Sequence, residues 1–158
     1  MTMRRTLLLA ATHLGMLAAG VALGIYLLPI LIAPQAPATA EVEQHTRAAS
    51  FSGRFRRDLK DSDALHWGEG TVSVGPSAIA LAGKLAPGPD YKLYLSPEFV
   101  ETEDDFKRLK PQMLRVGDVK TFDNFLVPLP AGVDPAKYTT VIVWCETFSQ
   151  FITAAKYR

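Results

Sequence analysis

Cysteine is scarce in this chain: Cys145 is the single cysteine among 158 residues. One cysteine excludes an internal disulfide, a CxxC redox pair and the CxxCH motif of covalent haem attachment. The zinc-protease motif HExxH, the GxSxG nucleophile elbow and the Walker phosphate loop are also absent. We therefore do not expect a conventional enzyme built on a nucleophile, a base and an orienting group.

Histidine is almost as scarce, with 3 residues in the chain: His13, His45 and His66. The first lies in an apolar segment and the second in a Pro/Ala-rich stretch, which leaves His66 for a structured site. A zinc site with two histidines in the folded part would need His45 to fold back. The sequence therefore predicts no zinc site with two histidines, and no metal-binding residues are assigned.

Charged residues are missing from positions 6 to 40. Within this region Leu14 to Ala33 is nearly continuous apolar sequence, and about 20 such residues cross the hydrocarbon core of a membrane as a helix. Arg4 and Arg5 precede the run, so the positive-inside rule places the N-terminus in the cytoplasm and the rest outside. The expected parts are a cytoplasmic tip (1–5), a transmembrane signal anchor (6–33), a linker (34–50) and a domain (51–158).

A cleaved signal peptide is the alternative, because the small residues Ala38-Thr39-Ala40 provide a cleavage site after Ala40. The apolar regions of signal peptides run to about 7 to 15 residues, and the longer run here favours an uncleaved anchor. Either way the domain reaches the periplasm or cell surface, an oxidising compartment. Gly20 and Gly24 fit the small-xxx-small pattern of helix pairing, which is a weak indication of an oligomer.

The stretch from Ala33 to Ala49 is rich in Pro, Ala and Thr and has no apolar periodicity, so we expect a semi-extended linker. The chain has 17 Lys+Arg against 16 Asp+Glu. Basic and acidic residues mix closely after residue 50, as in Arg56-Arg57-Asp58. This mixture gives no strong positive field, so no binding of nucleic acid is predicted.

After residue 50, apolar residues recur mostly at every second position, in short runs separated by Gly, Pro, Asp and Asn. This pattern predicts an all-β domain, a single antiparallel β-sandwich of about eight strands. The expected strands are 51–55, 70–74, 78–82, 91–96, 113–119, 122–129, 138–144 and 147–154. One short helix is expected from Glu101 to Lys110, because acidic residues lead, basic residues trail and Pro111 ends it.

Cys145 ends an apolar run that begins at Val141. In a strand, Val141, Val143 and Cys145 share one face, and Ile142 and Trp144 share the other. Both faces are apolar, so we expect a central strand that is covered on both sides. Free cysteine is often buried as packing, yet a strand end lies close to solvent. Two readings of His66 also stay open: a half-buried structural residue, or a neighbour of Cys145 that favours the thiolate.

Four sequence blocks taken together resemble the DM13 domain family. They are Leu65-His66, Gly88-Pro-Asp-Tyr-Lys-Leu-Tyr-Leu-Ser96, Val116-Gly-Asp-Val-Lys120 and Val141-Ile-Val-Trp-Cys145. The resemblance spans about Phe51 to Tyr157. It implies a β-rich extracytoplasmic domain of a kind often found beside DOMON and cytochrome b561-like modules. It also implies a near-invariant cysteine, here Cys145, proposed to act in redox or electron transfer.

From this resemblance we predict a redox-competent thiol at Cys145 that acts with a partner protein. His66, Trp144 and Asp90 are the supporting candidates. The sequence requires no cofactor, and a haem or metal at Cys145 stays open. The alternative function is a non-enzymatic binding or scaffolding module in which Cys145 is structural.

Overall fold

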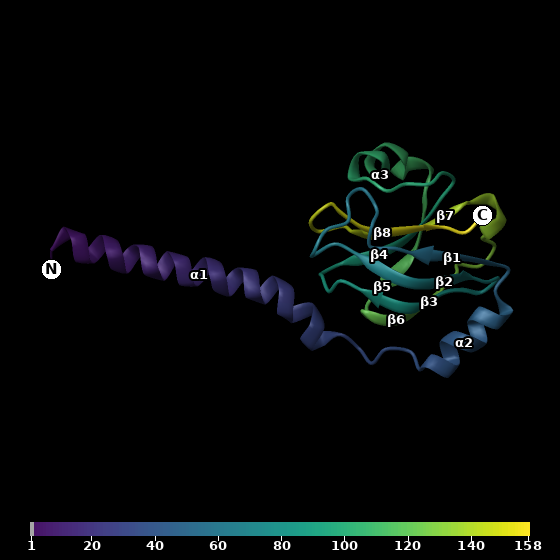
Figure 1. Ribbon diagram of the computed structural model, residues 1–158, viewed down its shortest axis with the longest axis horizontal. Coiled ribbons are helices and arrows are strands. Elements are labelled where there is room, and N and C mark those ends of the chain that lie inside the picture. Colours follow the sequence, from purple (N-terminus) through teal and green to yellow (C-terminus); the bar gives the residue numbers. More distant parts are fainter. Residues whose placement is uncertain (1) are drawn as a thin grey trace.

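The protein consists of a long N-terminal helix and a β-domain (Figure 1). The structure is a computed structural model and describes residues 2–158. The helices are α1 (Met3–Ile32), α2 (Thr39–Ala48) and α3 (Glu103–Leu109), with 3-10 turns at Lys110–Gln112 and Pro135–Lys137. The strands are β1 (Phe51–Phe55), β2 (Gly68–Val74), β3 (Ala78–Leu85), β4 (Tyr91–Ser96), β5 (Leu114–Val119), β6 (Asp123–Pro128), β7 (Thr140–Cys145) and β8 (Gln150–Lys156).

The strands form two four-stranded sheets, in the orders β1-β2-β3-β6 and β5-β4-β7-β8. All neighbouring strands pair antiparallel. The apolar side chains of both sheets meet in one core, to which Val72, Leu93 and Val143 contribute fully buried side chains. The predicted antiparallel β-sandwich of about eight strands is therefore confirmed.

The two sheets also approach each other along an edge, where β1 lies beside β8. A Cβ atom at Gly53 would lie 2.6 Å from the carbonyl oxygen of Lys156. The close contact between these two backbones therefore requires glycine at this position.

Helix α3 covers the outer face of the β5-β4-β7-β8 sheet (Figure 1). Its buried residues Phe106 and Leu109 pack with Ile142 and Trp144 of β7. The hydroxyl of Thr102 accepts a hydrogen bond from the backbone N–H of Asp105 and caps the helix. The expected short helix is confirmed. Strand β7 is covered on both sides, as predicted from the apolar residues on both of its faces.

The prediction of a semi-extended linker is wrong, because Thr39–Ala48 forms helix α2. Val42 is 1% exposed, and α2 lies against the sheet that contains β2 and β3. Ser73 of β2 donates a hydrogen bond to the hydroxyl of Thr46 at 3.2 Å. One buried apolar residue gives no periodic pattern, so contact with the sheet fixes a helix that the sequence did not reveal.

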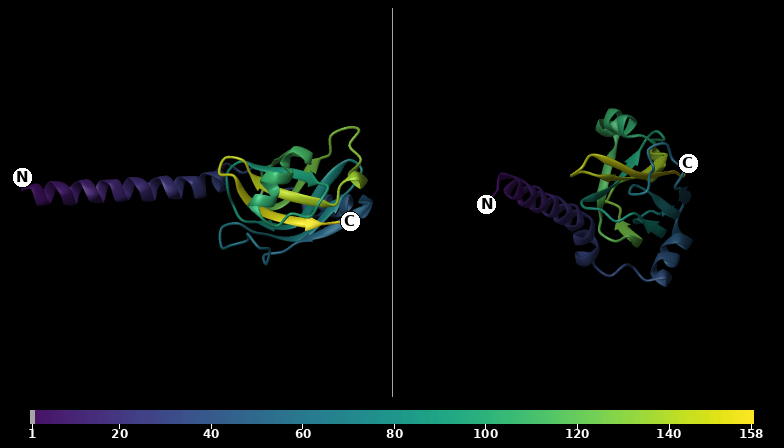
Figure 2. Two further views of the ribbon diagram at one scale, coloured as in Figure 1. Left: turned by 90° about the horizontal axis from the view of Figure 1, so that it is seen from above. Right: turned by 60° about the vertical axis from the view of Figure 1, so that its left-hand side comes forward.

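Helix α1 projects from one end of the sandwich, and the C-terminus lies at the other end (Figure 2). Its mean hydropathy reaches 2.2, and no residue of its most apolar window is buried. By length and composition α1 fits a single-pass membrane anchor, and a signal sequence has the same properties.

Candidate functional site

The candidate site lies where β7 ends beside the start of β4. Cys145 is the last residue of β7 and pairs with Tyr91, the first residue of β4. The loop from Pro87 to Asp90 leads into β4 and therefore passes beside the sulfur atom. Tyr91 donates a hydrogen bond through its hydroxyl to the carbonyl of Ala86 at 3.0 Å, which closes this loop on itself.

The thiol of Cys145 is buried and hydrogen-bonded. The side chain is 2% exposed, and Sγ donates to the carbonyl oxygen of Pro89 at 2.9 Å. Burial raises the pKa of the Cys145 thiol, and the negative charges of Asp90 and Glu146 add to the rise, against backbone N–H groups of the following turn. The sulfur is consequently a neutral thiol at neutral pH.

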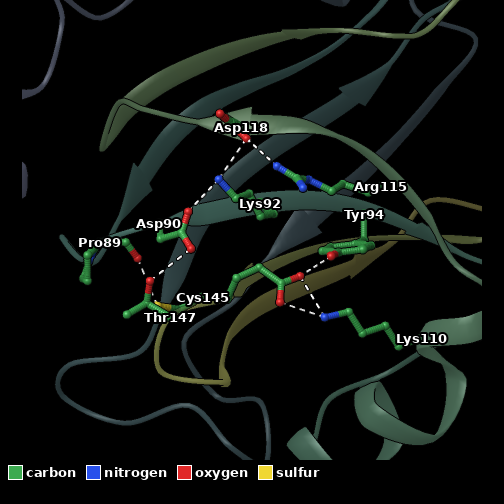
Figure 3. A network of polar contacts seen from close by, with 10 residues as sticks. Pro89, Asp90, Lys92, Tyr94, Lys110, Arg115, Asp118, Cys145 and Thr147 are labelled. Carbon is green, nitrogen blue, oxygen red and sulfur yellow. Dashed lines mark hydrogen bonds and ion pairs between the residues drawn. The ribbon is translucent and has the colours of Figure 1, made fainter.

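Asp90 connects the loop to the turn that follows Cys145 (Figure 3). Its backbone adopts a φ of 56°, and its carbonyl accepts the N–H of Glu146 at 3.2 Å. Its carboxylate accepts the hydroxyl of Thr147 at 3.0 Å and lies 2.6 Å from the ammonium of Lys92. The ammonium of Lys92 holds the pKa of Asp90 below its usual value. Asp90 thus holds the two sides of the site together.

Lys92 extends the network away from the sulfur. Its ammonium also lies 3.0 Å from Asp118 of β5, which in turn binds Arg115 at 3.0 Å. The Lys92 side chain is 13% exposed, so its charge depends on these two carboxylates. These ion pairs join β4 to β5 and fix the position of Asp90.

A second polar cluster lies on the α3 side of the sheet and was not predicted. The hydroxyl of Tyr94 donates to Glu146, and the ammonium of Lys110 lies 2.7 Å from the same carboxylate (Figure 3). Partial burial opposes ionisation of Glu146, but Lys110 and Tyr94 outweigh it and lower the pKa of this carboxyl. No local motif relates residues 94, 110 and 146, so only the fold could reveal this cluster.

Cys145 and His66 line the same cavity, which has a volume of about 460 Å³. Nδ1 of His66 lies 2.9 Å from the carboxylate of Asp63. An ionised carboxylate only accepts hydrogen bonds, so Nδ1 carries the proton and Nε2 of a neutral ring keeps a lone pair. The hydrogen bonds of residues 2–158 leave Nε2 without a protein partner. The wall of the cavity therefore includes a cysteine and a histidine whose Nε2 can accept a proton.

Trp144, another supporting candidate, lies on the opposite face of β7. Its ring stacks on Phe106 at 3.9 Å between centroids, with an interplanar angle of 9°. The ring of Tyr94 meets the ring of Phe106 edge-on, at 5.2 Å between centroids. The structure therefore brings Cys145, His66 and Asp90 to one end of the domain and places Trp144 beneath α3.

The side chains at the cavity do not form a metal site. Cys145 and His66 supply one sulfur and one imidazole, and residues 2–158 contain no group of three or more His, Cys, Asp or Glu that could hold an ion. A stable transition-metal site needs about four ligands, and Cys145 and His66 supply two.

Gly88 is required by the ring of Tyr91. A Cβ atom at Gly88 would overlap the Tyr91 hydroxyl and lie 2.8 Å from the ring carbon that bears it. Gly88→Ala is expected to lower the free energy of unfolding by about 1 to 3 kcal/mol, because the ring must move within a packed core. Urea denaturation measures the change. Gly75→Ala is the control for alanine at glycine, because the backbone there is not in the positive-φ region and a Cβ atom would meet only ordinary contacts of 3.4 Å or more. Equal losses in the two variants would contradict the steric explanation.

Comparison with known families identifies one family model that matches the β-domain. A family model described as Electron transfer DM13 matches residues 55–157. No curated protein and no solved structure matches the chain. The matched range extends from the end of β1 to the end of β8 and includes Cys145, His66 and Asp90. Because this range covers well over half of the chain, the protein belongs to the electron transfer DM13 family.

Proposed function

We propose that this protein is a membrane-anchored electron-transfer accessory whose redox group is the thiol of Cys145. In this proposal residues 1–5 are cytoplasmic, 6–33 span the membrane, 34–50 connect, and 51–158 form the extracytoplasmic domain. The observation that carries the redox role is that Cys145 and His66 line one cavity in a DM13 domain. The domain has a single thiol, so it acts with a second protein rather than alone.

The chemistry that fits a single thiol is exchange with a disulfide of the partner. Sγ of Cys145 bonds to one partner sulfur, the partner S–S bond breaks, and the other sulfur leaves with the electron pair and takes up a proton. The thiol must first lose its own proton, and Nε2 of His66 is the acceptor in the cavity. The raised pKa of Cys145 makes this transfer the slow step unless the partner changes the site.

The second candidate is a binding module in which Cys145 is part of the core. Its 2% exposure and its hydrogen bond to Pro89 favour this reading. In this case the neutral thiol stabilises the loop before β4 and has no redox role. The two candidates differ in whether the native thiol reacts.

Reaction with 2,2′-dithiodipyridine decides between them, because this small aromatic disulfide releases one coloured thiopyridone for each thiol that it captures. The reduced full-length protein in detergent micelles is expected to release thiopyridone while folded, and Cys145→Ser to release none. His66→Leu is expected to slow the release several-fold, because the proton acceptor is lost. Release that begins only in guanidinium would overturn the redox proposal and support the binding module. An absorption spectrum of the same sample would reveal a bound haem.

A further inference from the structure

The cavity at Cys145 is bounded partly by α1. Ala22, Ile25 and Tyr26 of α1 form one wall, and the ends of the sandwich strands and their loops form the others. The hairpin turn between β7 and β8 and the loop between β1 and β2 both lie at the end of the sandwich from which α1 projects (Figures 1 and 2). The cavity therefore opens at the end of the sandwich from which α1 projects.

The length of α1 places this opening at a membrane surface. Arg5 and Tyr26 are 21 residues apart, which is about 32 Å of helix at about 1.5 Å per residue. The hydrocarbon core of a bilayer is about 30 Å thick, and tyrosine and arginine favour its two interfaces. With Arg5 at the cytoplasmic interface, Tyr26 lies at the outer boundary of the hydrocarbon core. The last residues of the 6–33 segment then cross the headgroup layer, because the bilayer with its headgroups is about 40–45 Å thick. The cavity wall at Tyr26 then lies between headgroups and acyl chains.

Exposed apolar side chains on the two loops agree with this placement. Leu65 precedes β2 and is 60% exposed, and Phe148 in the turn after β7 is 46% exposed. Both residues also line the cavity. Large apolar side chains on loop tips are unfavourable in water but favourable at the acyl boundary of a membrane. They surround an entrance that faces lipid.

The lining of the cavity indicates what enters. Most of its wall is apolar, with Ile25, Pro87 and Ile152 among the lining residues, and its volume of about 460 Å³ is that of a small-molecule site. The polar residues of the lining include His66 and Gln150. Nε2 of His66 can accept a hydrogen bond from a hydroxyl, and the amide of Gln150 can donate or accept one. A ring that carries hydroxyl groups can form hydrogen bonds with these two residues, and a hydrocarbon chain can pack against the apolar part of the wall.

We propose that the cavity between α1 and the Cys145 end of the sandwich binds a membrane-dissolved quinol, with its ring beside His66 and its tail passing Tyr26 into the bilayer. This inference rests on the anchored orientation in the proposed function, but it does not require Cys145 to be redox-active. The ligand reaches the site from the lipid, so no channel through the domain is needed.

Binding of decylubiquinol to the full-length protein in phosphatidylcholine vesicles tests the proposal. Quenching of tryptophan fluorescence reports binding, because Trp67 directly follows His66. The wild type is expected to show saturable quenching. Ala22→Phe fills the cavity from the helix side without touching the domain core, and is expected to weaken binding at least about tenfold. Ala11→Phe makes the same change on α1 outside the cavity and is expected to bind as the wild type does.

A second ligand distinguishes the contribution of the hydroxylated ring to binding from that of the hydrocarbon tail. Decylbenzene, which lacks hydroxyl groups, is expected to bind much more weakly, and His66→Leu is expected to remove most of this difference. Equal binding of decylbenzene and decylubiquinol would overturn the quinol assignment in favour of a site for lipid chains. Quenching that is linear, or equal in Ala22→Phe and Ala11→Phe, would overturn the site itself.

Failure of the proposed function gives a different result. A native thiol that reacts with 2,2′-dithiodipyridine only in guanidinium, together with saturable quinol binding by the same protein, would overturn the redox role and leave the quinol site intact. The mass of the protein purified from membranes shows whether residues 1–40 are retained. Loss of that segment would overturn the anchor and the quinol site together, whereas a retained anchor without saturable quenching would overturn the quinol site alone.

Discussion

Alkylation of Cys145 by iodoacetamide in the native protein is expected to accelerate about tenfold for each pH unit between pH 6 and pH 9, about a thousandfold in total. The thiolate is the reacting form, and burial raises the pKa of Cys145 above that of an ordinary thiol. The rate therefore keeps rising where the rate of a free cysteine levels off, near pH 8.5. Mass spectrometry of timed samples measures the rate, and circular dichroism at each pH confirms that the protein is folded.

Asp90→Asn is the matched variant for this measurement. It removes a negative charge that contributes to the raised pKa of Cys145 and keeps an oxygen that can accept from Thr147. At pH 8 it is expected to react faster than the wild type. A rate that levels off below pH 8 in the wild type would contradict the buried neutral thiol.

The same pKa shift makes folding depend on pH. The folded thiol keeps its proton where the unfolded thiol has lost it, so this contribution to stability is fully present below about pH 8.5. It is lost as pH rises through the folded pKa. The decline in the free energy of unfolding above pH 8.5 is therefore expected to be smaller in Cys145→Ala than in the wild type.

Trp144→Ala is expected to lower the free energy of unfolding by about 3 to 5 kcal/mol. The ring is 2% exposed and stacks on Phe106, so its removal leaves a cavity beneath α3. Much of the apolar contact that holds α3 to the sheet disappears with it. Urea denaturation followed by circular dichroism measures the loss.

Two variants identify the cause of that loss. Trp144→Phe retains a ring against Phe106 and removes an indole N–H that is buried and has no partner among residues 2–158, so its loss is expected to stay below about 1.5 kcal/mol. Phe99→Ala truncates an aromatic residue that is 40% exposed, and is expected to change stability by no more than about 0.5 kcal/mol. A loss for Trp144→Ala as small as that for Phe99→Ala would show that α3 does not depend on this contact.

Much of the fold follows from local sequence pattern. Alternation at period two predicted the strands, and the charge order of residues 101–110 predicted α3. The parity of Val141 to Cys145 predicted that Cys145 and Trp144 lie on opposite, covered faces of one strand, and the two core clusters confirm this; which face lies between the sheets was not predicted. Helix α2 escaped prediction because a single buried valine carries no period.

The contacts of the candidate site, by contrast, follow mainly from the tertiary structure. The sequence by itself singled out Cys145, as the one thiol of the chain, and His66, as the one histidine of the β-domain, because rarity is visible without a structure. It also determined that a long apolar helix, without charged residues after Arg5, precedes the domain. The tertiary structure decided that Cys145 donates to Pro89, that His66 reaches the same cavity, and that α1 closes one wall of it. These contacts join residues 40 or more positions apart, and antiparallel pairing and packing bring them together, whereas local sequence encodes only the strands themselves.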